Sequence, residues 1–288
     1  MKVTVLASGS SGNATFVEAG GTRILVDAGV GPKNLARKLA ETGAGGPPHA
    51  IVVTHGHGDH VGECARIAKG LKIPIYASES TARTAYLGDR SRVKVFGARS
   101  PFVIGDITIS PLPIPHDAAQ VALVFSHDGR SAGLVTDLGE VPPRLPEHLA
   151  ACDVLLIESN HDPEMLESGP YPIFLKRRVA SARGHLSNFQ THALLRRLSP
   201  RTHTVVLMHL SRTNNRADLA LEIARDALGD RPVKLTAALQ DDARVFDAND
   251  DAHHAHHVKG RKPRKSGAQL AFDFSAPSES YAGTPASP

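Results

Sequence analysis

Thr54-His55-Gly56-His57-Gly58-Asp59-His60 directly follows the apolar run Ile51-Val52-Val53. A strand that ends there would deliver three imidazoles and a carboxylate into one tight turn, around which the two small glycines let the backbone bend. Imidazole nitrogen and carboxylate oxygen are the ligands that suit zinc, manganese or iron. The stretch therefore predicts a metal site at the end of a strand, in preference to a polar loop that is merely rich in histidine.

Length and composition are those of an ordinary globular protein. Of the 288 residues, 41% are hydrophobic and 22% are charged, which is typical of soluble domains. No uncharged apolar run approaches the roughly 20 residues that a bilayer requires, and the apolar run after Met1 is too short for a signal peptide. Cys64 and Cys152 lie far apart in the sequence, and we expect them to be reduced core thiols. These features predict a cytoplasmic protein with no membrane partner.

Strand and helix patterns alternate up to about residue 246. Residues 3–6, 14–18 and 23–26 are expected to form strands separated by glycine-rich turns, which favours an opening antiparallel meander. Further strands are expected at 51–53, 107–112, 121–126, 132–136, 154–158 and 204–208. Helical patterns occur at 34–41, 61–69, 143–150, 173–180, 188–198 and 216–228. Antiparallel strands mixed with helices predict one catalytic domain, residues 1–246, built as a layered α/β/β/α sandwich.

The composition changes at residues 247–288. This segment is rich in histidine, then in basic residues, then in serine, proline, alanine and glycine, so it cannot bury a core and we expect a disordered tail. One apolar island interrupts it, Gln269-Leu270-Ala271-Phe272-Asp273-Phe274. Such islands are often docking motifs that order on a partner, although a remnant of composition explains this one equally well. Five basic residues between Lys259 and Lys265 make nucleic acid a candidate partner, which the net charge of +4 does not by itself establish.

Three further candidate ligands lie at or near the ends of expected strands: His116 in PIPHDA, Asp137 in LVTDLG and His209 in VVLMHLS. Taken singly, each has an ordinary explanation, such as a hydrogen-bonded histidine or an aspartate that forms a turn. Taken together with residues 55–60, they supply the donors that a site for two metal ions needs, including a carboxylate that can bridge two ions.

HGHGDH followed in order by His116, Asp137 and His209 resembles the ligand set of the metallo-β-lactamase superfamily of hydrolases. The resemblance covers residues 1–246 and implies a four-layer αββα sandwich. It implies that His55, His57 and His116 hold one divalent ion, that Asp59, His60 and His209 hold a second, and that Asp137 bridges them. Zinc or manganese is expected, with iron as a further candidate. Asp27, in ILVDAG, matches the first motif of the superfamily and would orient ligand histidines through hydrogen bonds.

Other segments narrow the resemblance. ASGSSGN at 7–13, ESNHD at 158–162, GPYPIFLKRR at 169–178, GHLSN at 184–188 and HLSRTNN at 209–215 are similar to the YycJ/WalJ-type branch, a group regarded as exonuclease-like. GHLSN followed by MHLS is also similar to the closing motifs of tRNase Z and of the cyclic phosphodiesterases of phosphonate metabolism. In those relatives a histidine such as His185 faces the scissile phosphate.

Phosphodiester hydrolysis explains why these residue types are needed. Two adjacent divalent ions lower the pKa of a water between them, so that hydroxide is available near neutral pH, and they neutralise the phosphate oxygens. We therefore give catalytic roles to Asp59, at the metal site, and to His185, as the proton donor to the leaving alkoxide. The alternative for His185 is a histidine that caps the helix beginning near Asn188.

Residues that contact the substrate are harder to recognise. A serine- and glycine-rich loop can offer backbone N–H groups to a phosphate, and Lys176, Arg177, Arg178 and Arg183 can hold a phosphate backbone or form an ordinary charged surface. With nine Phe, four Tyr and no Trp, no aromatic stacking platform is predicted. The candidates for substrate contact are Ser11, Asn13, His161, Arg178 and Asn188.

The predicted function is a dinuclear metal-dependent phosphodiesterase, specifically a 5′-to-3′ exonuclease acting on DNA. The peptide Gln269–Phe274 resembles the short motif that docks on the bacterial sliding clamp, although Phe272 replaces the usual leucine. One alternative is a hydrolase of small cyclic phosphodiesters or other small esters. The second is a non-catalytic protein that binds nucleic acid or the clamp, whose metal site is structural.

Overall fold

Two seven-stranded sheets form the centre of the computed structural model, which describes residues 1–250. The first sheet contains, in spatial order, β14 (Arg244–Asp247), β1 (Lys2–Ala7), β2 (Ala14–Ala19), β3 (Thr22–Val26), β4 (Ala50–Val52), β5 (Ile75–Ser78) and β6 (Val93–Phe96). The second contains β13 (Lys234–Ala237), β12 (Thr204–Met208), β11 (Val154–Glu158), β10 (Arg130–Val135), β9 (Gln120–His127), β8 (Ile107–Ile114) and β7 (Phe102–Ile104).

Both faces of each sheet are buried. Because successive side chains of a strand point to opposite faces, alternate residues enter different cores. In β11, Val154 and Leu156 belong to the core between the sheets, whereas Leu155 and Ile157 belong to the core on the outer side of the second sheet. The same division occurs in β2, where Val17 and Phe16 point to opposite sides. Such strands contain nearly continuous apolar runs, which is how VLLIE indicates a buried strand.

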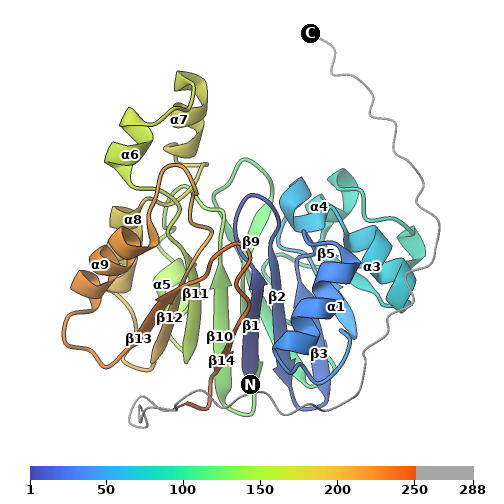
Figure 1. The fold of residues 1–288 in the computed structure, drawn as a ribbon. Helices are drawn as coiled ribbons and strands as arrows, with labels where there is room; N and C mark the ends of the chain where they lie inside the picture. Colours follow the sequence, from blue (N-terminus) through green and yellow to red (C-terminus); the bar gives the residue numbers. More distant parts are fainter. Residues whose placement is uncertain (251–288) are drawn as a thin grey trace.

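Helices cover the outer face of each sheet (Figure 1). Apolar residues of α1 (Pro32–Glu41), α3 (Cys64–Leu71) and α4 (Glu79–Thr84) pack on the first sheet. Those of α5 (Leu145–His148), α8 (Asn188–Leu195) and α9 (Ala217–Leu228) pack on the second. The order of layers is helix, sheet, sheet, helix, so the predicted αββα sandwich is confirmed. The remaining short helices are α2 (Gly58–Val61), the 3-10 turn η1 (Arg90–Arg92), α6 (Pro163–Ser168) and α7 (Ile173–Val179).

The strand directions bring several loops to one edge of the sandwich. In the first sheet β3 and β4 are parallel, and in the second β10, β11 and β12 are parallel. Because parallel strands end at the same edge of a sheet, the residues that follow them are neighbours. None of the helices between residues 1 and 250 is long and apolar enough to cross a membrane.

The observed elements differ from the prediction in several respects, and strands β5, β6, β7, β13 and β14 and helices α4 and α6 were not predicted. The opening antiparallel meander is confirmed for β1–β3, but the first sheet continues through parallel strands β4–β6. The predicted helix 61–69 is two helices, α2 and α3, separated at Gly62-Glu63, where the Glu63 N–H donates to the carbonyl of Ala28. The last strand, β14, ends at Asp247, which pairs with Lys2 in the first sheet. The docking motif 269–274 and most of the predicted tail lie outside the described residues.

Candidate metal centre

Backbone conformation turns the candidate ligands inward at the ends of the strands. Asp27 follows β3, Asp137 follows β10 and His209 follows β12. All three have left-handed backbone angles, with φ of +59°, +58° and +55°. Residues other than glycine adopt this region rarely, and such strain is concentrated at functional sites. Two predicted ligands, Asp137 and His209, and the predicted orienting residue Asp27 therefore come from sharp reversals that follow buried strands.

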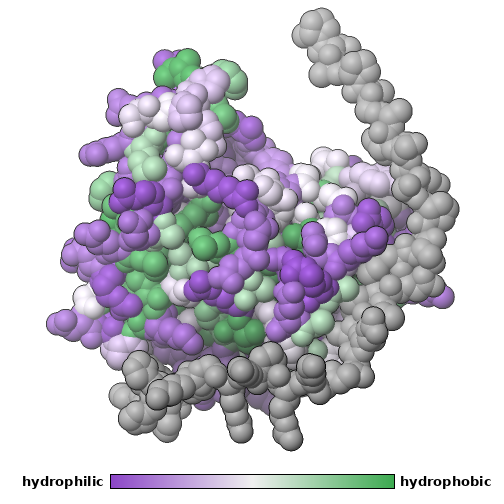
Figure 2. Space-filling model, viewed as in Figure 1, coloured by the Kyte–Doolittle hydropathy of each residue, from purple (hydrophilic) through white to green (hydrophobic). Residues whose placement is uncertain are grey.

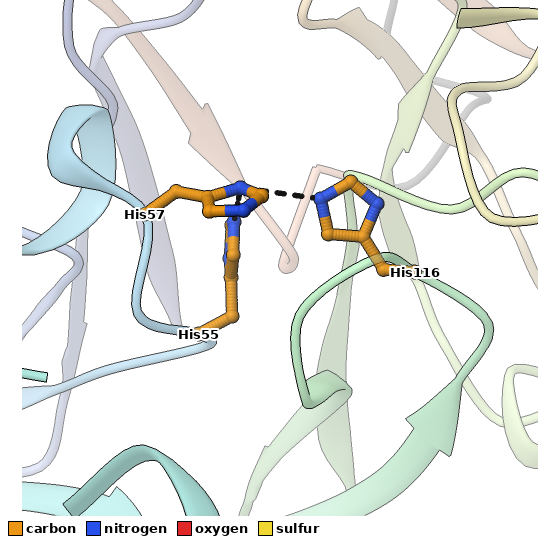
Figure 3. A group of neighbouring side chains, drawn as sticks. All are labelled: His55, His57 and His116. Atoms are coloured by element: carbon orange, nitrogen blue, oxygen red, sulfur yellow. Dashed lines mark hydrogen bonds between the residues drawn. The ribbon is translucent and has the colours of Figure 1, made fainter. Parts of the chain in front are cut away.

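Three histidines form the first group of donors, His55 and His57 after β4 and His116 after β8. His55 Nε2 lies 3.0 Å from His57 Nδ1, and His116 Nε2 lies 3.3 Å from the same nitrogen. Figure 3 shows that the rings of His55 and His116 both point to that of His57. Nitrogens about 2.0 Å from a tetrahedral zinc ion lie about 3.3 Å apart. The group therefore fits a single divalent ion.

A second group contains Asp59, His60 and His209. Asp59 Oδ2 lies 3.5 Å from His60 Nε2 and 3.7 Å from His209 Nε2. Asp137 Oδ2 lies 3.3 Å from His60 Nε2, and Asp137 also forms a group with His55 and His60. Among the described residues, Asp137 Oδ2 and His209 Nε2 are buried without a hydrogen-bond partner. Buried polar atoms are rarely left unpaired, so these two atoms fit a second ion close to the first.

The protonation states of the two groups suit cation binding to different extents. Burial lowers the pKa of His55 and of His116, which keeps both imidazoles neutral, the form that binds metal. Burial opposes ionisation of Asp137, but His209 and His60 together hold the pKa of Asp137 well below its usual range. His209 differs, since burial is outweighed by the nearby carboxylates of Asp137, Asp59 and Glu158, which raise the pKa of His209 to about 10.

The nitrogens that face away from the cluster have partners that fix the rings. Asp27 Oδ2 lies 2.8 Å from His60 Nδ1, while the Asp27 carboxylate also accepts from the backbone N–H and the hydroxyl of Thr54. His116 Nδ1 lies 3.1 Å from the carbonyl oxygen of Gly184. With a proton on each Nδ1, each Nε2 carries the lone pair that can coordinate a metal. Asp27 thus occupies the position that its predicted orienting role requires.

Glu158, at the end of β11, was not predicted as a site residue. Its Oε1 lies 2.9 Å from His185 Nδ1 and 3.0 Å from His209 Nδ1. Burial opposes the charge of this fully buried carboxylate, yet His185 and hydrogen bonds from both histidines lower the pKa of Glu158 to about 2. The sequence feature that could have indicated Glu158 is its position as the acid that ends the apolar run VLLIE.

Asp117 is a second residue that the sequence did not reveal. Its Oδ1 lies 3.1 Å from His57 Nε2 and 3.3 Å from His116 Nε2, so this oxygen contacts two rings of the histidine group. Its Oδ2 lies 2.6 Å from a terminal nitrogen of Arg178, on α7. Asp117 therefore links α7 to the histidine cluster.

A cavity of about 330 Å³ opens beside the two groups of donors. Its lining includes four predicted metal ligands, His57, Asp59, Asp137 and His209, together with His185 and Arg178. Asn13 lies against the ligands, with Nδ2 2.9 Å from His60 Nε2 and 3.1 Å from Asp59 Oδ2. Ser10 lines the cavity where Ser11 was expected.

Two other predicted contacts, His161 and Asn188, are buried and do not line the cavity. Asn188 is held by Ser159 and Asn215. Burial lowers the pKa of His161 to about 4. These two residues are placed to support the loops around the cavity.

Of the four predicted basic residues, Arg178 alone lines this cavity. Lys176 donates to the carbonyl of Glu167 and so joins α7 to α6. Arg183 Nε donates to the carbonyl of His116 over 3.0 Å, which positions the loop that carries this histidine. The run of basic residues thus divides into one at the cavity and others that tie neighbouring segments together.

Comparison with known proteins agrees with this geometry. Residues 22–210 match the family described as the β-lactamase superfamily domain. The chain is 38% identical over 230 residues to exodeoxyribonuclease WalJ of Streptococcus pneumoniae, covering 76% of this chain and 85% of WalJ. It is 34% identical over 225 residues to exodeoxyribonuclease YycJ of Bacillus anthracis, covering 75% and 85%. The metallo-β-lactamase fold protein YhfI of Bacillus subtilis shares the fold, with a TM-score of 0.65 and 18% identity over 85% of this chain and 98% of YhfI. The chain therefore belongs to the metallo-β-lactamase superfamily, in the group of the WalJ and YycJ proteins.

Proposed function

We propose that this protein is an exodeoxyribonuclease that removes nucleotides from the 5′ end of DNA. Its family makes it a metal-dependent hydrolase, and two relatives that align with three quarters of the chain are named exodeoxyribonucleases. The observation that carries phosphodiester chemistry is His185, which lines the cavity beside the donor groups and is paired with Glu158.

We assign the donors to two divalent ions. His55, His57 and His116 hold one, His60, His209 and Asp59 hold the second, and Asp137 lies between them. When bound, such ions supply an activated water and neutralise charge on the phosphate. The donor set of imidazole and carboxylate suits zinc or manganese, with iron as a further candidate.

His185 is positioned to give a proton to the leaving oxygen. Burial disfavours its charged form, but Glu158 raises the pKa of His185. Because Nδ1 is engaged by Glu158 Oε1, the second proton of the charged ring resides on Nε2, the nitrogen that remains for the substrate. A protonated imidazole is the general acid that cleavage of an alkyl phosphate ester requires.

The size of the cavity and the position of Arg178 support a strand end as the substrate. A cavity of about 330 Å³ is at the small end of the range for ligand pockets, so it admits part of one strand and not a duplex. Arg178 lines this space, and although its Nε and one terminal nitrogen pair with Asp117, the guanidinium has further N–H donors for a phosphate oxygen. This restriction supports cleavage at a strand end over cleavage within a duplex.

The experiment compares substrates side by side. Purified protein with zinc or manganese is offered 5′-phosphorylated DNA, the corresponding RNA and cyclic nucleotides, and Asp59→Ala serves as the control. Release of nucleotides from the 5′ end of DNA supports the proposal. Turnover of cyclic nucleotides alone would identify a small-molecule phosphodiesterase, no turnover would favour a non-catalytic binding protein, and activity that survives Asp59→Ala would identify a contaminant.

We further propose that the enzyme acts in the cytoplasm and is delivered to DNA by its C-terminal segment. The peptide Gln269–Phe274 resembles a motif that docks on the bacterial sliding clamp, and the basic residues between Lys259 and Lys265 would add nonspecific phosphate contacts. Both segments lie outside the described residues, so this part of the proposal rests on the sequence.

A further inference from the structure

Helix α7 projects beside the cavity and carries an exposed apolar tip. Together with α6 it stands above the sandwich (Figure 1). The side chains of Ile173 and Phe174 are 63% and 70% exposed, and Figure 2 shows apolar surface at the tip of this projection. Because burying an aromatic ring is favourable, we expect the exposed phenylalanine near the cavity to bind a partner.

The helical period places Phe174 on the side of α7 that borders the cavity. Residues four positions apart are neighbours on one helix face, so Phe174 lies one turn before Arg178. Arg178 lines the cavity together with Leu175 and Val179 of the same helix. Phe174 does not itself line the cavity; its exposed ring lies one helical turn from the residue that does.

Two contacts fix α7 relative to the catalytic groups. The backbone N–H of His185 donates to the carbonyl of Val179, the last residue of α7, over 2.9 Å. Arg178 and Asp117 are joined by the 2.6 Å ion pair, and Asp117 contacts His57. The position of Phe174 is therefore set by the same residues that shape the site.

The chemistry of α7 fits one class of partner. Its sequence, IFLKRRV, has three cations and no acid, which disfavours a cationic peptide. A flat aromatic surface next to cations is how proteins hold single-stranded nucleic acid, since bases stack on the rings while phosphates meet the charges. We propose that Phe174 stacks on an unpaired base of the DNA strand whose end lies in the cavity. This inference rests on the proposed nuclease function and adds a residue that selects unpaired strands.

The test combines a protein variant with a change in the DNA. Phe174→Ala and Phe174→Trp are compared with wild type on a 5′-phosphorylated single strand and on the same strand with its bases near the 5′ end removed. For wild type, removing the bases is expected to raise KM by roughly 10-fold, the effect of one lost stack. Phe174→Ala should show the raised KM on the intact strand, and base removal should then add little. Phe174→Trp should restore the wild-type pattern.

Phe189 supplies a matched control, because it is 57% exposed on α8 and does not line the cavity. Phe189→Ala should behave as wild type on both strands. Equal sensitivity to base removal in wild type and Phe174→Ala would overturn the inference while leaving the exonuclease proposal intact. A wild-type protein that degrades neither strand would instead overturn both.

Discussion

Glu158 Oε1 lies 2.9 Å from Nδ1 of His185, so this carboxylate decides which nitrogen of the ring is left for the cavity. The same oxygen lies 3.0 Å from His209 Nδ1, whereas Oε2 accepts from the backbone N–H groups of Leu138 and Leu186. All four neighbours are thus donors to one carboxylate, which couples the position of the proposed proton donor to that of a proposed metal ligand.

Glu158→Gln is expected to impair both functions. The amide of glutamine has one acceptor oxygen and one NH₂ donor. The NH₂ must therefore face either the two histidine N–H groups or the two backbone N–H groups, and the hydrogen bonds on that side are lost. We expect metal affinity to fall by about 10- to 100-fold and kcat by about 100-fold or more, measured by chelator competition and by DNA degradation. Glu164→Gln, at an exposed carboxylate of α6, is the control. Wild-type metal affinity in Glu158→Gln would contradict the positioning role.

His57→Ala and Asp59→Ala separate the two proposed metal positions. Each substitution removes one donor from one group and leaves the other group intact. We expect about two ions per wild-type chain and about one in each variant, measured by elemental analysis after dialysis, with DNA degradation lost in both. A variant that retains the wild-type stoichiometry would show that its residue is not a ligand.

Metal binding should release protons near neutral pH. The pKa of His209 is raised to about 10 in the metal-free protein, so the ring is protonated at pH 8 and must lose that proton to coordinate. Apparent affinity should therefore rise with pH up to about pH 10 and fall as pH decreases. Calorimetric titrations at pH 8, in two buffers that differ in ionisation enthalpy, measure the release. Equal heats in both buffers would contradict it.

The raised pKa of His209 also makes the free energy of unfolding of the metal-free protein depend on pH. Because the folded-state pKa of His209 is raised above that of an unfolded histidine, its contribution is fully present below about pH 6.5. That contribution should be lost as pH rises toward about pH 10. Urea denaturation of metal-free wild type at pH 6 and pH 9.5, compared with His209→Gln, measures it. An equal change in wild type and variant would show that other groups are responsible.

Asp27→Ala tests the support behind His60. The substitution leaves His60 Nδ1 and the backbone N–H and hydroxyl of Thr54 without their buried acceptor. Each unsatisfied group costs about 1–3 kcal/mol, so we expect the free energy of unfolding to fall by roughly 3 kcal/mol or more. Urea denaturation measures it, with Asp230→Ala at an exposed loop position as control. A change similar to that of the control would remove Asp27 from this role.

The donor cluster could be predicted because its signal is local. Polar residues that follow apolar strands, such as His116 and Asp137, meet wherever those strands end at one edge of a sandwich. Glu158 carries the same signal at the end of VLLIE, but it does not belong to the ordered ligand motif that runs from HGHGDH to His209. Its two histidine partners lie 27 and 51 residues away, and only the parallel arrangement of β11 and β12 brings His209 to it.

Other features depend on three-dimensional context that no period in the sequence encodes. Strands β5, β6 and β7 have three or four residues, too few to establish an alternation. Ser10 rather than Ser11 faces the cavity because the loop is set by a Gly9 φ of +138° and by a hydrogen bond from the Gly9 N–H to Asn13 Oδ1. The exposure of Phe174 could not be predicted either, because the apolar pattern of a helix does not show which apolar residues the rest of the fold leaves uncovered.

Removal of residues 266–288 tests delivery to DNA by the C-terminal segment. We expect the shortened protein to lose retention by immobilised sliding clamp and to keep its turnover of short DNA, because the donor groups and the cavity lie within residues 1–250. Phe272→Ala with Phe274→Ala in the full chain should have the same effect. Neutralising the basic residues from Lys259 to Lys265 should instead preserve clamp retention and weaken the salt dependence of DNA binding. Clamp retention that survives loss of the peptide would end the docking assignment, and loss of turnover would place residues 266–288 in the catalytic unit.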